Sequence, residues 1–409
     1  MFSRWYAARW QAALRKPYVQ ILFGARQTGK STLIRGLLPE GALALDLSNP
    51  EIRSRYLARP GDFLADCRAL PDGTTVFVDE AQAAPALFDA VQHLFDESRS
   101  RWRFILCGSS ARKLRRSGAN LLPGRSMLHR LLPLVSCERP SDERISPPFP
   151  APLPLEWPTP PARAFPVAGL TTRLAFGDLP GVVTAAAEDR VDLLRSYCLV
   201  HLEEEIRREA MVKDWGAFVR FLRLAATESG QIVNYAPIAR SVDLSQPTVK
   251  AHYQLLEDMF VGFHVPAYTR SPRKNLLSTP KFLFFDLGVR HAAADLRPSE
   301  DLVLANPGPL FEQWVGIELW KRLQYLGDGR LHYLRSRDGA EIDFIVERGG
   351  TLLPIEVKWT EHPDLTDARH LLTFLAEHPG KARQALIVCR CPRPMRLHEC
   401  VVALPWFCL

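Results

Sequence analysis

The feature that most constrains this chain is a glycine-bounded loop between a strand-like run and a helix-like run. Gly24 to Ser31 fits the pattern G-x4-G-K-S. The apolar run Tyr18–Phe23 precedes it, and apolar residues at helical spacing follow in Ser31–Leu38. Glycines let a backbone wrap closely around phosphate groups, and the free N–H groups of a first helical turn attract anions. The segment therefore predicts a phosphate-binding loop at the end of a strand.

The loop assigns roles to individual side chains. Lys30 would reach the β- and γ-phosphates of a nucleoside triphosphate, and the Ser31 hydroxyl would ligate Mg²⁺. A glycine-rich turn without a ligand is the alternative, which the strand and the helix on either side disfavour. The residues predicted to bind ATP are Gly24, Ala25, Arg26, Gln27, Thr28, Gly29, Lys30, Ser31 and Thr32.

A second motif tests this interpretation independently. The apolar run Val76–Val78 ends in two acids, Asp79 and Glu80. At the end of a parallel strand, Asp79 would complete the magnesium shell, and Glu80 would orient and polarise the attacking water. Acids at a strand exit are common when taken alone. Together with the upstream loop, they predict that the chain binds and hydrolyses ATP.

Length and composition limit the class of protein. The chain has 409 residues, more than one ordinary domain, and its 47% hydrophobic and 24% charged residues are typical of a globular protein. No apolar run reaches the ~18 residues of a membrane span, so we expect a soluble protein without a membrane partner. Eight scattered cysteines without a C-x-x-C pair favour reduced thiols and a cytoplasmic location. The formal net charge of +7 permits a polyanionic partner.

The hydrophobic pattern predicts three structured regions and a linker. Residues 1–138 alternate strand and helix patterns, which predicts an α/β core with a parallel sheet. Residues 139–168 are dense in proline, which excludes helix and central strand. Residues 169–300 are predicted to form helices, a helix-turn-helix over 235–260 and wing strands within 262–285, and residues 301–409 an α/β domain. The predicted strands are 18–23, 42–47, 74–78, 103–107, 331–336, 340–347, 351–359 and 384–389, and the other predicted helices are 188–208, 215–229, 310–326 and 367–378.

Several segments taken together resemble one family. They are Phe23–Thr32, Val78–Gln82, Cys107–Leu114, Leu122–Arg125 and Phe176–Pro180. In their residues and in their order along the chain, they resemble the AAA+-type prokaryotic ATPases of the AAA_14/DUF4143 family. The resemblance implies a P-loop ATPase core, a helical and winged-helix region, and a C-terminal α/β domain of the PD-(D/E)XK nuclease-like type.

The resemblance also implies roles outside the two phosphate motifs. Ser109 falls where AAA+ proteins place the polar sensor of the γ-phosphate, and Ser110 is its rival. Arg125 matches a Gly-Arg pair of the family and is a candidate arginine finger, for its own nucleotide or that of a neighbouring subunit. A salt-bridged surface arginine is the alternative. The AAA+ resemblance further implies a homo-oligomer.

A basic segment suggests that the partner is DNA. No acidic residue lies between Ser98 and Cys137, and this stretch includes the cluster Arg112–Arg116. Such a segment suits a phosphate backbone, whose neutralisation releases counterions. Contacts with ATP or a neighbouring subunit are the alternative. The helix Gln246–Asp258 has modest charge, so the predicted wing contacts to phosphate are Arg270, Arg273, Lys274 and Lys281, with protein–protein contact as the alternative.

The C-terminal region contains a second candidate site. Residues 353–359 alternate as a strand does, which places Glu356 and Lys358 on one face. A hairpin through Gly349-Gly350 would bring Asp343 beside them, and Glu312 on helix 310–326 would supply a further acid. Such acids hold Mg²⁺, and with a lysine they can activate water for phosphodiester cleavage.

Asp343, Glu356 and Lys358 match the D-x(n)-E-x-K signature of PD-(D/E)XK nucleases, in which Mn²⁺ can replace Mg²⁺. An inert copy of the fold, or a surface ion pair between Glu356 and Lys358, is the alternative. The two functional hypotheses are an ATP-driven protein acting on branched or single-stranded DNA, and a regulatory NTPase switch whose C-terminal domains only bind partners.

Overall fold

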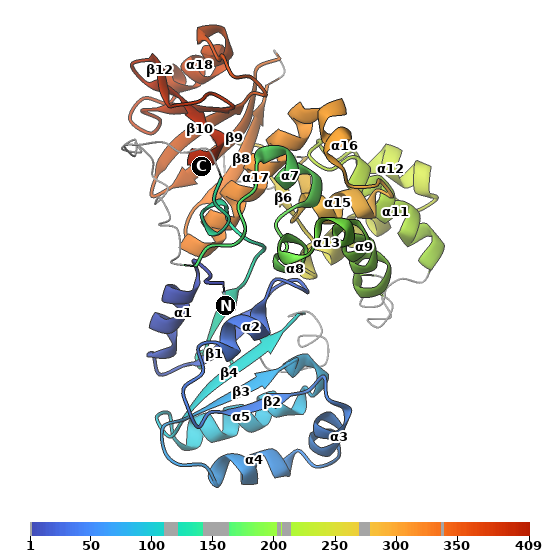
Figure 1. Ribbon diagram of the computed structural model, residues 1–409, viewed down its shortest axis with the longest axis vertical. Helices are drawn as coiled ribbons and strands as arrows, with labels where there is room; N and C mark the ends of the chain where they lie inside the picture. The colour runs from blue at the N-terminus through green and yellow to red at the C-terminus, as the bar shows by residue number, and fades with distance from the viewer. Residues whose placement is uncertain are drawn as a thin grey trace. The chain divides into compact units, whose positions relative to one another are not determined.

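The structure is a computed structural model, which describes residues 2–109, 122–141, 163–202, 206, 214–269, 279–336 and 339–409. The chain divides into two compact units. The smaller unit consists of Tyr6–Leu132 and Asp258–Phe260, and the larger unit of Met1–Trp5, Pro133–Glu257 and Val261–Leu409. Figure 1 labels the helices and strands of both units.

A five-stranded parallel sheet forms the centre of the smaller unit. Its strand order is β2-β3-β4-β1-β5, and every neighbouring pair is parallel. β1, β3 and β4 are almost entirely buried, as expected for strands covered on both faces. The predicted parallel α/β core is therefore confirmed. The strands are β1 (Val19–Phe23), β2 (Leu43–Asp46), β3 (Thr74–Asp79), β4 (Trp102–Gly108) and β5 (Ser126–Arg130).

Helices cover both sides of this sheet. Asn49 caps α3 by accepting a hydrogen bond from the Glu51 N–H (2.9 Å), and Pro50 takes the first helical position. α5 buries one apolar stripe, which is typical of a helix packed on a sheet. Figure 1 shows α4 and α5 on the side of the sheet opposite α2. The helices are α1 (Ala7–Leu14), α2 (Lys30–Arg35), α3 (Pro50–Ala58), α4 (Gly61–Arg68), η1 (Ala81–Ala83) and α5 (Ala86–Glu97).

The first part of the larger unit is mainly helical. The predicted helix-turn-helix is confirmed, because α12 ends at Asp243, whose φ of 56° turns the chain into α13. β6 (Gly262–Val265) and β7 (Lys281–Phe284) then form a two-stranded antiparallel sheet, as predicted for a wing. The helices are η2 (Ser136–Glu138), α7 (Leu170–Phe176), α8 (Pro180–Thr184), η3 (Ala187–Asp189), α9 (Arg190–Ser196), the π-helix η4 (Tyr197–Leu202), α11 (Trp215–Thr227), α12 (Tyr235–Val242), α13 (Gln246–Asp258), α15 (Leu287–Ala293) and α16 (Glu300–Ala305).

A six-stranded mixed sheet dominates the rest of this unit. Its order is β12-β13-β11-β10-β9-β8, with β10, β11 and β13 parallel and the other pairs antiparallel. α17 (Pro307–Leu326) packs on one face, and α18 (Arg369–Glu377) packs on the other. The strands are β8 (Arg330–Arg335), β9 (Glu341–Arg348), β10 (Thr351–Val357), β11 (Ala385–Cys389), β12 (Met395–His398) and β13 (Val401–Pro405), and the short helices are η5 (Leu365–Ala368) and η6 (Trp406–Cys408).

β9 contains one residue more than its partner β8. His332 pairs with Ile345, and Leu334 pairs with Ile342. Two residues of β9, Asp343 and Phe344, therefore lie opposite one residue of β8, Tyr333. As a result Ile342 and Ile345 belong to the same hydrophobic core, although two residues lie between them. A bulge of this kind re-aims a side chain, and here that side chain is Asp343.

A buried network of charges joins the segment around Ser136 to α17. The Asp178 carboxylate lies 3.2 Å from Arg139 Nη1 and 3.7 Å from Lys321 Nζ. Lys321 also pairs with Glu318 (3.2 Å), which accepts hydrogen bonds from the Ser136 N–H and Oγ at 3.0 and 2.9 Å. Each buried charge has an opposite charge beside it, as low-dielectric surroundings require.

All eight cysteines are free thiols. Among the residues that the structure describes, no helix combines the length and apolar character needed to cross a membrane.

Candidate active sites

The loop after β1 is held against the residue that follows β5. The Leu131 N–H donates to the Phe23 carbonyl at 2.8 Å. A Cβ atom on Gly24 would lie only 2.2 Å from the Leu131 carbonyl oxygen, so only glycine fits there. Gln27 and Gly29, with φ of 61° and 87°, turn the backbone into α2. The predicted strand, loop and helix are therefore present in that order.

Lys30 lies over the loop that precedes it. Its side chain is buried, and Nζ donates to the carbonyl oxygens of Gly24 (2.9 Å) and Ala25 (2.8 Å). Thr28 Oγ1 also donates to the Ala25 carbonyl at 3.0 Å. Ser31 follows in the first turn of α2 and is partly exposed. The ammonium group is thus positioned at the loop, where it can exchange carbonyl oxygens for phosphate oxygens.

The two predicted acids lie at the end of β3. Asp79 is 3% exposed, and its Oδ1 accepts a hydrogen bond from the Glu80 N–H at 3.1 Å. Glu80 has a φ of 54°, a left-handed conformation that is uncommon for a residue other than glycine. Arg35 of α2 lies 3.6 Å from Asp79 and 2.7 Å from Asp46 at the end of β2. The helix after the loop is therefore tied to both neighbouring strand ends.

The loop lysine and the acids converge near the end of β4, which lies between β1 and β3. Burial raises the pKa of the Cys107 thiol on β4 well above its ordinary value. The charges that act on the same thiol are those of Lys30, Asp79 and Glu80, so all three lie around it. Of the residues that the sequence assigned to one triphosphate, Lys30, Asp79 and Glu80 therefore lie near one another.

Gln82 is a site residue that the sequence reasoning did not assign. Its Nε2 donates to a Glu80 carboxylate oxygen and, at 3.2 Å, to Ser109 Oγ. Its Oε1 would lie 2.3 Å from a Cβ atom on Gly108, so the absence of a side chain there makes room for the amide. Oε1 itself is buried and has no hydrogen-bond partner. The only sequence signal was the place of Gln82 at the end of the segment Val78–Gln82.

The structure separates Arg125 from this group. β5 runs parallel to β1 with Ser126 beside Val19, so Arg125 lies at the amino edge of the sheet and the loop at its carboxyl edge. A five-residue strand spans about 16 Å. Arg125 Nε instead donates to Asp96 at 2.6 Å, in the surface salt bridge that was the alternative. Ser110 lies outside the described residues.

The C-terminal candidates come from three elements of the larger unit. Asp343 is on β9, Glu356 is near the end of β10, and Glu312 is on α17. Lys358 Nζ donates to Glu356 Oε1 at 2.8 Å. Ile355 and Val357, which alternate with these two residues, belong to the hydrophobic core on the other face of the strand. The predicted alternation of this strand is therefore confirmed.

The acids influence one another. Asp343 Oδ2 accepts a hydrogen bond from the backbone N–H of Val357 at 2.8 Å. Burial and the charges of Glu312 and Glu356 raise the pKa of Asp343 well above its ordinary value. Burial also raises the pKa of Glu356, against the opposing charge of Lys358. Glu356 Oε2 is buried without a hydrogen-bond partner.

Lys281 of β7 is an unexpected member of this cluster. It is 4% exposed, and its Nζ donates to Glu312 Oε1 at 2.8 Å. The prediction that Lys281 contacts a phosphate backbone is therefore wrong, because its ammonium group is buried among carboxylates. Within the described part of the chain, no group of three or more His, Cys, Asp or Glu side chains converges closely enough to hold a metal ion.

The first candidate site lies in a segment that matches a known family model. Residues 16–139 match the family model described as an AAA domain. Residues 307–409 match a domain of unknown function, DUF4143, and residues 168–300 match another, DUF8612.

Residues 16–139 are similar to an AAA domain and are named the AAA domain after that similarity.

Relatives of known sequence cover more of the chain than the AAA domain alone. An uncharacterized protein of Mycobacterium tuberculosis and one of Mycobacterium bovis are each 27% identical over 386 residues, covering 91% of this chain and 80% of the relative. The solved structure of PCH-2 from C. elegans has a TM-score of 0.24 and 12% identity, covering 61% of this chain and 65% of that chain. At that TM-score the structural likeness carries no weight, and the family matches support the domain assignment.

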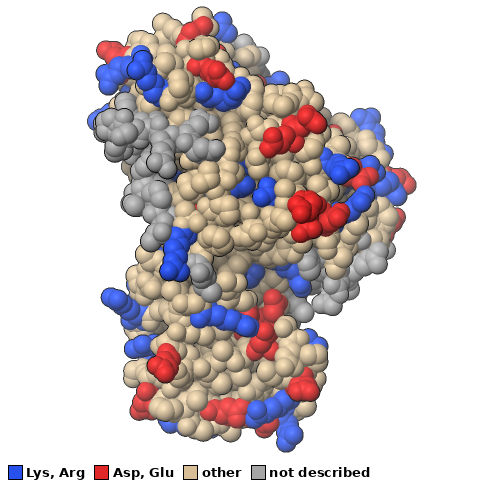
Figure 2. Space-filling view, viewed as in Figure 1, with Lys and Arg blue, Asp and Glu red and all other residues tan. Residues whose placement is uncertain are grey.

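The basic residues of the AAA domain are distributed among several partners. Arg101 pairs with Asp72 at 3.0 Å, besides the pair of Arg125 with Asp96. On the face shown in Figure 2, positive and negative side chains are interspersed. The predicted DNA-binding residues Arg112–Arg116, Arg270, Arg273 and Lys274 lie outside the described residues.

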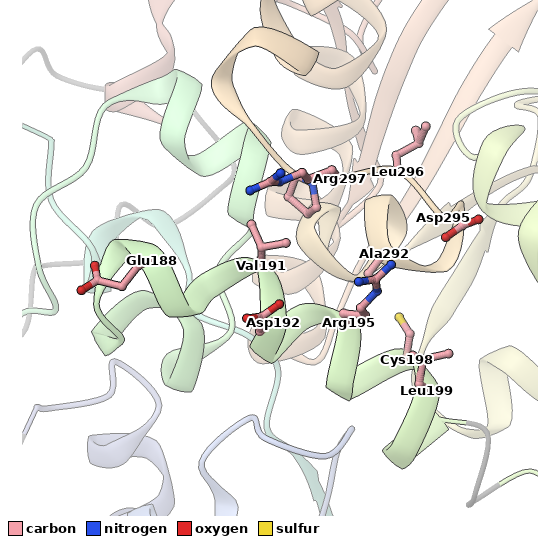
Figure 3. Close-up of a pocket in the computed structure, with 11 residues that line it drawn as sticks. Glu188, Val191, Asp192, Arg195, Cys198, Leu199, Ala292, Asp295, Leu296 and Arg297 are labelled. Atoms are coloured by element: carbon pink, nitrogen blue, oxygen red, sulfur yellow. The ribbon is translucent and has the colours of Figure 1, made fainter.

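A cavity of about 640 Å³ lies in the larger unit, apart from the predicted site residues. α9, the π-helix and the chain after α15 line it (Figure 3). Its lining includes Arg195 and Arg297 together with Glu188 and Asp192, so charges of both signs face it.

Proposed function

We propose that this chain binds and hydrolyses ATP in its AAA domain and uses the energy to act on DNA through the larger unit. The observation that carries this proposal is the position of the Lys30 loop after β1 and of Asp79 and Glu80 at the end of β3 in one parallel sheet. Lys30 follows β1, and the two acids lie at the end of β3, on either side of β4 in one parallel sheet. The carboxyl ends of such strands are the usual position of a ligand in open α/β folds.

The hydrolytic step follows from the chemistry of these side chains. Lys30 would neutralise developing charge on the β- and γ-phosphates, and Ser31 and Asp79 would hold Mg²⁺. The metal ion would supply charge stabilisation of the phosphates. Glu80 would orient the attacking water, and Ser109 would contact the γ-phosphate. Gln82 touches both Glu80 and Ser109, so it can transmit the state of the γ-phosphate to the carboxylate.

Two variants test the ATPase assignment. Lys30→Ala should lose ATP affinity because it removes the positive charge at the loop. Glu80→Gln should bind ATP normally and lose turnover by roughly 10²-fold or more, because an amide is a poor base for water. Equilibrium binding of a fluorescent ATP analogue and phosphate release measure the two properties separately. Normal turnover by Glu80→Gln would show that Glu80 does not position the water.

We also propose a Mg²⁺-dependent nuclease-like site formed by Glu312, Asp343, Glu356 and Lys358. Carboxylate oxygens are the donors that a hard cation takes, and Glu356 Oε2 is buried without a hydrogen-bond partner. In the described residues the acids do not converge closely enough to hold the ion, so binding would require them to move together. Burial is the main cause of the raised pKa values of Asp343 and Glu356, and neighbouring carboxylates add to it, so a nearby cation would favour the ionised forms. Glu312, Asp343 and Glu356 would hold the ion, Mg²⁺ or Mn²⁺, and Lys358 would stabilise charge on the scissile phosphate.

The nuclease assignment has its own test. Asp343→Ala combined with Glu356→Ala should abolish Mg²⁺- or Mn²⁺-dependent cleavage and leave the ATPase rate intact. Forked, four-way, single-stranded and duplex DNA are the substrates to compare. Cleavage that persists in the double variant would assign the activity to another site or to a contaminant.

DNA as the partner is supported by the acid-free segment from Ser98 to Cys137 and by the excess of basic residues. DNA should raise the ATPase rate, and the apparent DNA affinity should fall steeply as salt increases. An ATPase rate that ignores DNA at low salt would contradict this partner.

A homo-oligomer is supported by the position of Arg125 at the sheet edge away from its own loop. If Arg125 serves a neighbouring subunit, Arg125→Ala and Lys30→Ala proteins should each be inactive alone and regain ATPase activity when mixed. A Lys30→Ala subunit can then lend its Arg125 to an intact loop. Absence of recovery in mixed oligomers would exclude a finger acting between subunits.

The second candidate function is a regulatory NTPase switch whose larger unit only binds partners. The pairing of Glu312 with Lys281 and of Glu356 with Lys358 favours this alternative, because paired carboxylates need no metal ion. Failure of Mn²⁺ to bind the full-length protein in the absence of nucleotide would favour the switch.

A further inference from the structure

The second helix of the helix-turn-helix, α13, presents a polar stripe to solvent. Gln246, Lys250 and Gln254 are spaced four residues apart along this helix, and all three are exposed. Side chains at this spacing lie one above another on a single helix face. The buried residues of α13 are Val249, His252, Tyr253, Leu255 and Leu256. Two amides and one ammonium group are therefore turned away from the core.

The buried face of α13 fixes the direction of this stripe. The centre of the Tyr253 ring lies 4.9 Å from that of Phe221 on α11 and 4.8 Å from that of Phe282 on β7. The His252 ring lies 5.0 Å from Phe218 and 5.1 Å from Phe221, and burial lowers the pKa of this histidine. Because α13 is packed against both a helix and a strand, its exposed face is held in place.

The two acids of α13 lie in its last turn. Glu257 Oε1 accepts a hydrogen bond from the His264 N–H of β6 at 2.9 Å, and Glu257 Oε2 lies 3.0 Å from His264 Nδ1. Asp258 is the last residue of the helix and is partly buried. Glu257 lies about 10 Å from Lys250 along the helix axis. The first three turns of α13 therefore contain no acid.

A further acid, Asp243, lies in the turn between α12 and α13. It is exposed, and it is the only Asp or Glu between residues 235 and 256. Its φ of 56° gives a reason for an aspartate at this position, because Asp and Asn adopt the left-handed conformation more readily than other residues with a side chain. The turn thus requires the shape of this side chain, and asparagine would provide that shape without the charge.

The chemistry of the stripe fits the major groove of duplex DNA. Glutamine pairs with N6 and N7 of adenine, and lysine with O6 and N7 of guanine. The stripe is about 12 Å long, which corresponds to roughly three to four base pairs at about 3.4 Å each. The core of a protein interface is rich in aromatic and other large apolar side chains. Among the residues that the structure describes, none of the exposed large apolar side chains lies on α12 or α13.

We propose that the larger unit reads duplex DNA through α13, with Gln246, Lys250 and Gln254 contacting base edges in the major groove. Helix-turn-helix modules insert the amino-terminal part of their second helix into this groove. The inference rests on the proposed action on DNA, and it adds a duplex segment of preferred sequence to the DNA that the protein recognises.

Selection from a random duplex library tests the reading of bases. Full-length wild-type protein without nucleotide should enrich one sequence over roughly three to four adjacent base pairs. A variant that combines Gln246→Ala with Gln254→Ala has the same charge, so it should still bind duplex DNA and lose this preference. Enrichment of the same sequence by both proteins, or no preference in the wild type, would refute base contacts by the two glutamines.

Affinity for the selected duplex tests the ammonium group of the stripe. Fluorescence anisotropy at low salt measures it for wild type, Lys250→Ala and Lys381→Ala. Lys250→Ala should weaken binding by roughly tenfold. Lys381→Ala is the matched control, because it removes the same charge from an exposed position elsewhere in the larger unit, and it should leave the affinity within about twofold. Equal affinities of the two variants would contradict the role of Lys250.

Asp243→Asn gives a test in the opposite direction. It keeps a side chain that suits the turn and removes a negative charge next to the stripe, so it should tighten duplex binding by roughly threefold. A misfolded protein would not bind DNA more tightly, so this variant remains informative if Lys250→Ala folds poorly. Unchanged or weakened binding by Asp243→Asn would contradict a DNA-facing α13.

The choice of DNA separates this inference from the proposed function. If the protein binds forked or single-stranded DNA and ignores duplex DNA, the proposed action on DNA stands and the role of α13 is refuted. If the protein binds no DNA of any form and its ATPase rate ignores DNA, both fail, and the exposed face of α13 is left to a protein partner.

Discussion

At the scale of single residues, Gln82 connects the two side chains on which ATP turnover is proposed to depend. It donates to Glu80 and to Ser109, and Gly108 leaves room for its amide. The amide therefore holds the Glu80 carboxylate in a fixed direction and senses the hydroxyl proposed to face the γ-phosphate. We therefore propose that Gln82 is a positioning residue, which acts through Glu80 and Ser109.

Gln82→Ala should reduce the kcat of ATP hydrolysis by roughly tenfold or more and leave the KM for ATP within about twofold, because a misaligned base costs catalysis and not binding. Steady-state phosphate release over a range of ATP concentrations measures both constants. A raised KM with unchanged kcat would place Gln82 in nucleotide binding instead.

Asp286 makes a prediction about pH. Its carboxylate accepts hydrogen bonds from the N–H groups of Asp178 and Val289 at 2.6 and 3.1 Å. Burial raises its pKa from 3.8 to about 6, with the Asp178 charge adding to the rise and Lys321 opposing it. The folded state therefore binds the proton more tightly than the unfolded state does. Stability from this group is present below pH 4 and is lost as the pH rises through 6.

Asp286→Asn removes this titration. The free energy of unfolding of the variant minus that of the wild type should increase by on the order of 2–3 kcal/mol between pH 4 and pH 7. Taking this difference cancels groups that do not interact with Asp286 and have lowered pKa values, such as Glu318. Urea unfolding at several pH values measures it, and a flat difference would contradict the assignment.

At the scale of elements, the phosphate-binding loop depends on the backbone around Leu131. Gly24→Ala would place a Cβ atom against the Leu131 carbonyl oxygen and should destabilise the AAA domain by about 1–3 kcal/mol. Gly61→Ala is the matched control, because position 61 has open space in the same unit and begins α4. Thermal unfolding and ATP binding measure the effect. Equal behaviour of the two variants would show that the close contact is not structurally important.

The sequence pattern predicted some elements well and others poorly. The buried strands β1, β3 and β4 appear as continuous apolar runs, and the loop between β1 and α2 follows from its glycines. β5 was missed because only Met127 and Leu128 are apolar in this half-exposed edge strand. The prediction of an exposed Lys281 was also wrong. A lysine on a predicted wing is usually solvated, and only tertiary packing buries this one.

Tertiary packing also decided which site residues could be predicted from the sequence. Lys30, Asp79 and Glu80 could be grouped from sequence because parallel strands bring their carboxyl ends to one edge. Gln82 and Lys281 could not, since their roles arise from contacts with Ser109 and Glu312 that no local pattern encodes.

At the scale of the whole molecule, two compact units should respond differently to nucleotide. A ligand stabilises the unit that binds it by RT ln(1 + [L]/Kd), about 2.7 kcal/mol at a hundredfold excess over Kd. Mg-ADP should raise the unfolding temperature of the transition that belongs to the AAA domain and leave the other transition in place. Scanning calorimetry measures both, with Lys30→Ala as the control that should not shift. An equal shift of every transition would mean that the units unfold together.

The extra residue in β9 has a consequence for comparing relatives. Side chains alternate between the two faces of a sheet along a strand. The extra residue therefore moves every later side chain of β9 to the opposite face of the sheet. Deleting it would turn Val346 from one core toward the other and take Asp343 away from Glu312. Two chains could therefore share every acid and lysine of this cluster and still differ in whether the acids meet. The spacing between Glu341 and Glu356 carries as much information as the identity of the residues.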